Sequence, residues 1–221
     1  MPEILPGIHQ VEGVDPSPDF TTHVYLVREP TGGYTLIDTG VPGSEGAIVA
    51  YLKKIGSSPK EVSTILITHL HNDHTGSLKR LKGLTNAKVY AHWLEAAWIA
   101  GRPKYDGPGS PPSSPMEVDV RIKDGDPIPV AGGLVAYHTP GHTPGHTAYY
   151  SPARKLVFSG DLFFGLPKLG LTVPDFTHHM QSAQISARRL TEIPIDSILS
   201  YHGGPFLHGA GAELQALVKT F

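Results

Sequence analysis

Four side chains that can bind a metal ion lie within one short run of this sequence. The run is His69-Leu70-His71-Asn72-Asp73-His74, with three imidazoles and one carboxylate. Neutral imidazole and carboxylate are ligands that borderline divalent metals prefer. On an extended loop, alternate residues face the same way, so His69 and His71 should point together. Asp73 and His74, at the start of a helix, can face a second position nearby. The run therefore predicts the first part of a metal centre.

Further ligands are expected downstream, because one short run supplies only part of a coordination sphere. Three candidates each follow a predicted strand and each has a glycine beside it. They are His142 in Pro140-Gly141-His142, Asp161 in Ser159-Gly160-Asp161, and His202 in Tyr201-His202-Gly203. Glycine permits backbone angles and close approaches that a side chain would block. These three positions are therefore the candidates that complete the centre.

Taken together, the candidates resemble the ligand set of the metallo-β-lactamase superfamily of hydrolases. The HxHxDH motif of that family, followed by a later histidine, aspartate and histidine, matches His69, His71, Asp73, His74, His142, Asp161 and His202. The resemblance covers nearly the whole chain in the expected order. It implies an α/β fold of one domain over residues 1–221, a four-layer αββα sandwich with two mixed β-sheets between outer helices. The site would lie at one edge, between the sheets.

The resemblance also implies a role for each ligand. One metal would be held by His69, His71 and His142, the other by Asp73, His74 and His202, and Asp161 would bridge the two. Two metals about 3.5–4 Å apart can share a carboxylate and a hydroxide. Metal binding lowers the pKa of water to about 7, which gives a nucleophile at neutral pH. Asp73 could also accept a proton and orient this bridging hydroxide. Zinc is the metal expected, and iron or manganese accept the same ligands.

Three further polar residues are candidates for the surroundings of the centre. Asp38, which ends Thr35-Leu36-Ile37-Asp38, matches a family position that supports the ligands from behind, with a turn-forming Asp-Thr-Gly as the alternative. His146 repeats the Gly-His pattern later in the chain, so it is expected behind the ligands or in a structural role. His23 precedes a predicted strand, where it either lines the site or lies at the strand edge.

The family does not fix the substrate, because its members differ in what they cleave. The pattern is most similar to the glyoxalase II-like branch, which hydrolyses thioesters. Only 19 residues follow His202, so we expect no C-terminal glutathione-binding domain. Acyl-homoserine lactonases carry a tyrosine three residues after the bridging aspartate, where this chain has Phe164, and that difference argues against a lactonase. An ester, thioester or related bond is therefore the expected target.

Other activities remain open for the same site. An apolar pocket would suit a general esterase or phosphoesterase, and its expected residues are Leu162, Phe163, Phe164 and Leu166. Phosphodiesterase, phosphotriesterase and β-lactamase activities, alone or combined in a promiscuous enzyme, are alternatives. A mononuclear iron oxygenase of the persulfide dioxygenase type and a non-catalytic metal-binding protein are two more. The complete second ligand set favours two metals over one.

The elements that position these residues can be predicted from periodicity. A hairpin, a helix and a buried strand that runs into the histidine run are expected at 24–38, 44–55 and 64–68. A helix near 77–81, a strand at 88–91 and a helix from Trp93, with Trp93 in the core, should follow. A proline-rich loop at about 105–115 separates two similar halves and has the composition of a surface loop, which could also cover the site. Strands at 134–138, 147–150, 155–159 and 197–200 and helices at 182–190 and from 212 complete the chain.

Bulk composition limits the partners. Net charge is −2 and lysine and arginine do not cluster, so a small-molecule substrate is expected and nucleic acid is not. No apolar run has the length of a membrane span, so no membrane partner is expected. The start Met1-Pro2-Glu3-Ile4 has no signal-peptide pattern, which favours a cytoplasmic location. The absence of cysteine excludes disulfides, thiolate metal ligands and a cysteine nucleophile. The oligomeric state is not readable from the sequence.

Overall fold

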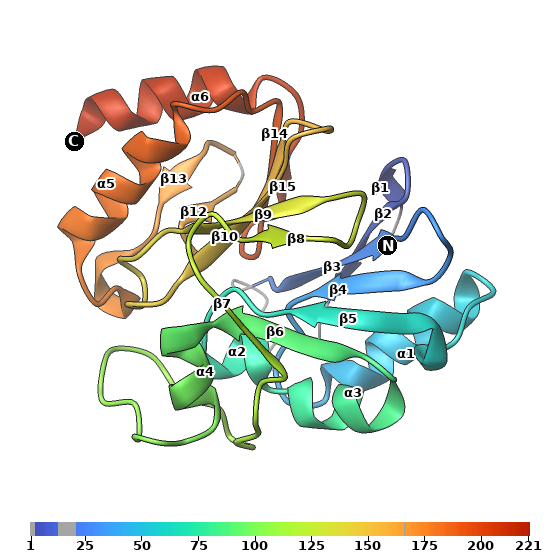
Figure 1. Ribbon diagram of the computed structural model, residues 1–221. Helices are drawn as coiled ribbons and strands as arrows, with labels where there is room; N and C mark the ends of the chain where they lie inside the picture. The colour runs from blue at the N-terminus through green and yellow to red at the C-terminus, as the bar shows by residue number, and fades with distance from the viewer. Residues whose placement is uncertain (1–2, 13–20, 166) are drawn as a thin grey trace.

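Two β-sheets pack face to face in this protein, and helices cover the outer side of each sheet (Figure 1). A computed structural model describes residues 3–12, 21–165 and 167–221. The chain builds the lower sheet of Figure 1 first and the upper sheet afterwards. The αββα arrangement expected from the sequence is confirmed.

The first sheet has the strand order β1-β2-β3-β4-β5-β6-β7. Its strands are β1 (Glu3–Leu5), β2 (Ile8–Glu12), β3 (His23–Arg28), β4 (Tyr34–Ile37), β5 (Val62–Leu66), β6 (Lys88–His92) and β7 (Val120–Ile122). Strands β1 to β4 pair antiparallel, whereas β4 to β7 pair parallel. The elements between these strands are α1 (Ser44–Lys54), η1 (Pro59–Glu61), α2 (Asn72–Thr75), α3 (Leu78–Leu84) and α4 (Trp93–Ile99).

The second sheet has the strand order β15-β14-β11-β10-β9-β8. Its strands are β8 (Pro127–Ile128), β9 (Leu134–His138), β10 (Thr147–Ser151), β11 (Leu156–Gly160), β14 (Ser197–Ser200) and β15 (Pro205–Phe206). Only β11 and β14 pair parallel here, among the described strands. The remaining elements are β12 (Phe163–Phe164), β13 (Gly170–Leu171), η2 (Pro174–Phe176), α5 (Met180–Leu190), α6 (Ala210–Leu217) and η3 (Val218–Thr220).

Alternation of apolar side chains along the strands produces the layers. In β3, Val24 and Leu26 pack in the core between the first sheet and its helices, whereas Tyr25 and Val27 pack in the core between the sheets. In β10, Tyr149 faces the same inter-sheet core while its neighbours face α5 and α6. Successive strand residues point to opposite faces, so a strand covered on both sides must be apolar throughout. This explains why the sequences of these strands are continuous apolar runs.

The parallel strand pairs decide where the site forms. Strand β4 lies parallel to β5, and β11 lies parallel to β14. The carboxyl ends of parallel strands meet at one edge of a sheet, and ligand-binding loops gather there. The segments after these four strands carry, in order, Asp38, the run 69–74, Asp161 and His202. The topology therefore brings the candidates of both sheets to one edge.

Most predicted elements are confirmed, with small shifts at their ends. The strand expected at 64–68 lies at Val62–Leu66, and the N–H of Thr68 donates to a carboxylate oxygen of Asp38 instead of joining the ladder. The expectation of a buried Trp93 is wrong, because this residue is 48% exposed. Trp93 begins α4, and the inner side of that helix is formed by Glu95, Ala96 and Ile99.

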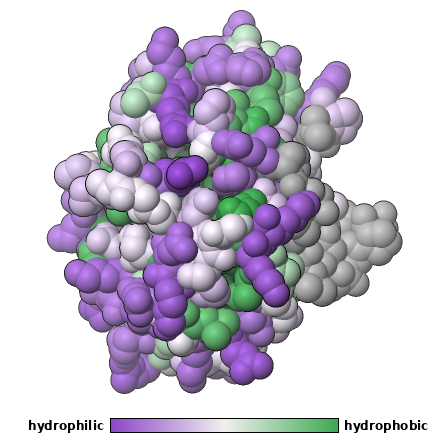
Figure 2. Space-filling view, turned by 90° about the vertical axis from the view of Figure 1, so that its right-hand side faces the viewer, coloured by the Kyte–Doolittle hydropathy of each residue, from purple (hydrophilic) through white to green (hydrophobic). Residues whose placement is uncertain are grey.

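Among the described residues on the face seen in Figure 2, no extended apolar area is visible. Apolar residues form small separate areas there among hydrophilic ones (Figure 2). Within the described ranges, no helix combines the length and the apolar character that a membrane crossing requires.

Candidate metal centre

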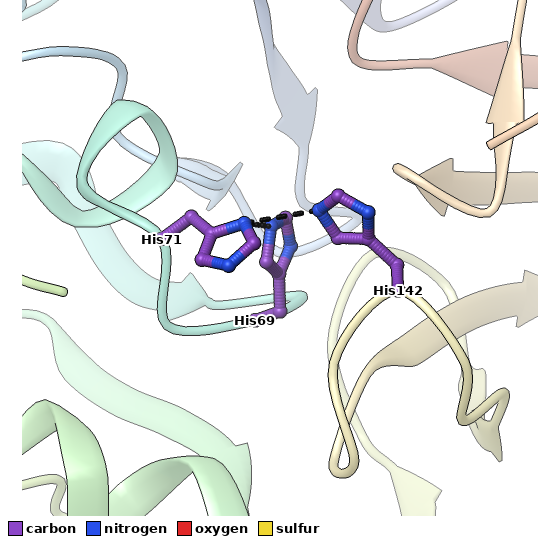
Figure 3. A group of neighbouring side chains, drawn as sticks. All are labelled: His69, His71 and His142. Atoms are coloured by element: carbon purple, nitrogen blue, oxygen red, sulfur yellow. Dashed lines mark hydrogen bonds between the residues drawn. The ribbon is translucent and has the colours of Figure 1, made fainter. Parts of the chain in front are cut away.

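Three imidazole rings from both sheets form the first half of the centre. His69 and His71 lie on the segment after β5, and His142 lies on the loop between β9 and β10. Nδ1 of His71 is 3.1 Å from Nε2 of His69 and 3.0 Å from Nε2 of His142. Figure 3 shows the three rings converging on one point from opposite sides. All three side chains are buried, and their ligand atoms could hold one ion.

Two carboxylates and two imidazoles form the second half. Nε2 of His202 lies 3.2 Å from Oδ2 of Asp73 and 3.3 Å from Oδ2 of Asp161. Nε2 of His74 lies 3.1 Å from Oδ1 of Asp161. Asp161 also reaches the first half, with Oδ2 at 3.4 Å from Nε2 of His142. The structure thus brings all seven sequence candidates together, with Asp161 between the halves.

Backbone carbonyls fix the protons of two of these rings. Nε2 of His71 lies 2.9 Å from the carbonyl oxygen of Pro108, and Nδ1 of His202 lies 3.0 Å from that of Thr21. A carbonyl oxygen can only accept, so both of these nitrogens must carry a hydrogen. A neutral imidazole has one hydrogen, which leaves the inner nitrogen of each ring with a free lone pair.

Asp38 fixes two more rings from behind. Its Oδ2 accepts from Nδ1 of His74 at 2.9 Å and from the hydroxyl of Thr68 at 2.8 Å. Because the Thr68 hydroxyl donates to Asp38, its oxygen accepts from Nδ1 of His69 at 3.1 Å. Asp38 has a φ of 58°, a left-handed conformation that aspartate tolerates better than most residues. The carboxylate therefore directs Nε2 of both His69 and His74 into the centre.

A chain of hydroxyl groups fixes the fifth ring. The hydroxyl of Thr177 donates to the carbonyl of Val173, so it can accept from Thr172, 2.9 Å away. The oxygen of Thr172 then accepts from Nδ1 of His142 at 3.0 Å. In the neutral form, which binds metal, each of the five histidines would therefore present a bare nitrogen to the centre. Outer partners of this kind orient metal-binding imidazoles.

Charge differs between the two halves. Burial lowers the pKa of His69, His71 and His142, so the first half consists of neutral imidazoles. Burial would raise the pKa of Asp161, but His202 and His74 hold it well below its usual range. Burial would lower the pKa of His202, but Asp161 and Asp73 raise it to about 10. The second half therefore attracts positive charge, and a divalent ion would displace its protons.

The donor set fits divalent metal ions. Bare nitrogens of His69, His71 and His142 converge at 3.0–3.1 Å, where lone pairs repel unless a cation lies between them. Nε2 of His74 and Oδ1 of Asp161 are buried and lie 3.1 Å apart, yet neither makes a hydrogen bond of good geometry to a described residue. Buried polar atoms without partners are rare, and an ion is one reason for them.

The other expected residues lie in different places. His146 is buried behind the centre, where its Nε2 accepts from the N–H of Asp161 at 3.1 Å. Phe164 lines the cavity, and its ring stacks on His202 with centroids 5.3 Å apart. His23 contacts Gln10 through Nδ1 at 2.9 Å and is not among the described residues that line the cavity. His23 is the first residue of β3.

Sequence reasoning missed Glu95, which is fully buried and joins two ligand loops. Its Oε2 accepts from the N–H of Leu70 at 2.7 Å, between His69 and His71. Its Oε1 accepts from the hydroxyl of Thr143 and the N–H of Gly145, both at 2.8 Å. Glu95 thus ties the first-sheet ligand segment to the loop of His142. The signal in the sequence was a glutamate at helical spacing with the apolar residues Ala96 and Ile99.

Tyr201 is a second residue that the sequence did not single out. Its ring lies over His74 with centroids 3.7 Å apart, and its hydroxyl donates to the carbonyl oxygen of Asp73. Because the ring is buried, it closes the back of the second half of the centre.

A cavity of about 260 Å³ opens onto the centre. Five candidate ligands reach it, namely His71, Asp73, His142, Asp161 and His202. Its other walls are Val41, Asn72, Gly109, Ser110, Phe164 and Phe176. The apolar pocket expected from 162–166 is therefore only partly present. Leu162 and Phe163 pack in the core below α5 and α6, and Leu166 lies outside the described residues.

The proline-rich loop covers part of the centre. The N–H of Asn72 donates to the carbonyl of Ser110 at 2.8 Å, and Oδ1 of Asn72 accepts from the N–H of Ser113 at 2.9 Å. Gly109 has a φ of 84°, and a Cβ built on it would lie 2.4 Å from Nε2 of His71. A side chain at this position would collide with the ring, so glycine allows the loop to lie on it.

The sequence also matches proteins already known. The sequence model of the metallo-beta-lactamase superfamily matches residues 17–202. The uncharacterized protein YobT of Bacillus subtilis is 27% identical over 217 residues, which cover 90% of each chain. A hydroxyacylglutathione hydrolase of Pseudomonas aeruginosa is 30% identical over 190 residues, 83% of this chain and 62% of that protein. For the relative of that name from Rhodopseudomonas palustris BisA53, the match covers only 48% of its length.

Solved structures with the same architecture support the fold. A metallo-beta-lactamase family protein of Thermus thermophilus superposes with a TM-score of 0.73 at 26% identity, over 98% of this chain and 80% of that one. A metallo-beta-lactamase of Cronobacter sakazakii gives a TM-score of 0.72 at 26% identity, over 90% and 79%. The four layers described above are therefore those of known structures.

Proposed function

The chain belongs to the metallo-β-lactamase superfamily of metal-dependent hydrolases, and from this premise we propose that it uses two divalent metal ions to hydrolyse an ester, thioester or related bond. One observation carries the proposal. Five imidazoles with outward protons and two carboxylates converge, and they form two adjacent groups that could each hold an ion. A protein that bound metal only for stability would not need both groups to open into a cavity.

The proposed ligands follow from the geometry. His69, His71 and His142 would hold one ion, Asp73, His74 and His202 would hold the other, and Asp161 would contact both. Nitrogen and oxygen donors of this kind suit zinc, and they also accept iron or manganese. We therefore propose zinc as the resident metal.

Each residue contributes a defined part of the chemistry. Bound ions would supply Lewis acidity, which lowers the pKa of water and polarises a scissile carbonyl. Asp73 lies at the cavity with its side chain 29% exposed, so its carboxylate can accept a proton from an attacking water. The Phe164 ring and the loop over His71 limit the access of bulk water.

The relatives support an acyl substrate. Several of them are named hydroxyacylglutathione hydrolases, and such substrates are thioesters. The chain spans only about half to three-fifths of their length, so we propose the bond type and not the glutathione part. We also propose a small-molecule substrate and a cytoplasmic location.

Metal content and hydrolysis, measured on the same sample, test this function. We expect about two metal equivalents per chain and turnover of carboxylic esters or thioesters. His71→Ala and His202→Ala should each reduce metal content to one equivalent or less and lower kcat by more than about 100-fold. His208→Asn is the matched control, because His208 is exposed, pairs with Asp196 and is not among the described residues that line the cavity. One iron per chain without hydrolysis of any ester, thioester or phosphoester would overturn the proposal.

A further inference from the structure

Three of the cavity-lining residues outside the proposed ligand set are apolar. They are Val41, Phe164 and Phe176. The Phe164 ring lies almost parallel to the imidazole of His202, at an angle of 14°. Phe176 is 47% exposed although it is a large apolar residue. Covering apolar surface of this kind releases about 25 cal/mol for each Å² removed from water, so an apolar group would bind beside the centre.

The other lining residues outside the proposed ligand set are polar or small and carry no positive charge. They consist of Asn72, Gly109 and Ser110. No lysine or arginine is among the described residues that line the cavity. The residues outside the described ranges do not include lysine or arginine either. A negative group on the far end of a substrate would therefore lose water without gaining a cationic partner, which is costly.

Cavity size limits the substrate further. Cavities that enclose drug-sized ligands usually measure about 300–1,000 Å³. The cavity here is about 260 Å³, and the proline-rich loop forms part of its rim through Gly109 and Ser110. A short acyl group fits these dimensions better than a long or branched one.

We infer that this site selects neutral esters or thioesters with a short apolar acyl chain and discriminates against acyl chains that carry a second negative charge. The inference rests on the hydrolytic function proposed above. The acyl chain would lie against Val41, Phe164 and Phe176, with the scissile carbonyl directed at the metal-binding residues. The thiol or alcohol part of the substrate would leave toward the solvent.

Thioesters of N-acetylcysteamine test the inference, because their leaving group is neutral and the same throughout. The metal-loaded protein would be given the acetyl, butyryl or succinyl thioester. A thiol reagent would then measure the rate at which N-acetylcysteamine is released. The chain has no cysteine, so the reagent has no background reaction with it. Each buried methylene contributes about a fourfold gain, so butyryl should exceed acetyl in kcat/KM by roughly 15-fold. Succinyl should fall at least about tenfold below butyryl, because its carboxylate has no cationic partner.

Variants of the apolar wall show whether the cavity causes the preference. Phe176→Ala and Phe164→Ala should reduce the butyryl-to-acetyl ratio to below about fourfold, the value for one methylene. Phe176→Lys should raise the rate with succinyl relative to butyryl, because it adds the missing cation. Ile185→Ala is the matched control, since Ile185 is 62% exposed on α5 and does not line the cavity. A ratio within one protein does not depend on how much of the sample is active.

The possible failures are distinct. Hydrolysis of succinyl at the butyryl rate, or a chain-length ratio that both alanine variants leave unchanged, would overturn the inference and leave the proposed function standing. If the metal-loaded protein hydrolysed none of the three thioesters and no ester, the proposed function and this inference would both be wrong.

Discussion

The buried carboxylate of Glu95 connects the two loops that carry His69, His71 and His142, the first group of candidate metal ligands. Glu95 accepts hydrogen bonds from Leu70, Thr143 and Gly145, and burial raises its pKa to about 7 although these bonds lower it. Each of its oxygens faces only donors. An amide of the same shape would therefore place an NH₂ group against an N–H or O–H donor and lose that contact.

Glu95→Gln should weaken the first metal group without changing a ligand. Loss of outer support for metal ligands lowers affinity by about 10–100-fold. Removal of a buried hydrogen bond also costs about 1–3 kcal/mol of the free energy of unfolding. Competition with a chelator measures affinity, and urea unfolding measures stability. Glu213→Gln, on the exposed side of α6, is the control. Unchanged affinity in the Glu95 variant would show that the connection is dispensable.

The stacked pair His92 and His138 predicts a pH dependence of stability away from the metal centre. The rings lie 4.3 Å apart at an angle of 9°. Burial and then His138 lower the pKa of His92 to about 4, below its ordinary value of 6.5. The folded state therefore binds fewer protons than the unfolded state between these values. The stabilisation is complete above pH 6.5 and is lost as the pH falls toward 4.

His92→Phe should remove this part of the pH dependence. Between pH 7 and pH 5, the wild-type protein should lose up to about 2 kcal/mol more unfolding free energy than the variant, and less where solvent screens the ring. Urea unfolding of both proteins at the two pH values gives the difference. Other histidines also titrate in this range, so only the difference between the proteins is informative. Equal losses in both would contradict the role of His92.

At the scale of elements, the proline-rich loop is held on the centre by α2. The backbone N–H of Asn72 donates to the carbonyl oxygen of Ser110, and its side-chain oxygen accepts from the N–H of Ser113. The carbonyl of Pro108 accepts from His71. The loop therefore holds a proposed ligand, His71, in its orientation and also lines the cavity through Gly109 and Ser110.

Asn72→Ala should loosen this loop while α2 stays intact. It removes one hydrogen bond, worth about 1 kcal/mol, which corresponds to roughly a fivefold increase in the open population. Trypsin cleavage after the exposed Lys104 should accelerate by that factor, and KM should rise. Asn86→Ala, at an exposed position before β6, is the matched control. Equal cleavage rates for both variants would show that other contacts hold the loop.

At the scale of the whole molecule, the two proposed metal-binding groups draw residues from both halves of the chain. The first group takes two ligands from the first sheet and one from the second, and the second group also takes ligands from both. The two sheets share one core, in which Tyr25 and Leu66 meet Tyr149 and Phe158. We propose that residues 1–221 form one domain that unfolds as a unit.

Removal of the metal should therefore lower Tm in a single step. An ion present at 1,000 times its Kd stabilises by about 4 kcal/mol, and a chain of this size changes by about 2–4 °C per kcal/mol. A chelator that removes both proposed ions, each bound at this saturation, should thus lower Tm by roughly 20 °C, measured by calorimetry. Two separate transitions after chelation would instead indicate two independent domains.

The sequence by itself determined the ligand types and most elements. Strand and helix periodicities depend on neighbouring residues alone, so 24–38, 44–55 and 197–200 were predicted correctly. The spacing in the run 69–74 reflects local geometry in the same way. Its resemblance to a known motif, with the later His142, Asp161 and His202, indicated the rest of the ligand set.

Tertiary structure alone decided how the centre is supported and what surrounds it. The proton on His202 depends on Thr21, 181 residues away, and the role of Glu95 depends on loops 25 to 50 residues away. Trp93 is exposed, and Phe164 lines the cavity whereas Phe163 does not. Both outcomes depend on which face of a helix or strand packs against the rest of the protein. These contacts form only when distant segments pack, and no local pattern records them. The run from His69 to His74 thus indicated the chemistry. Tertiary packing decided which histidine nitrogens carry hydrogens, which loop lies over the centre and what shape the cavity has.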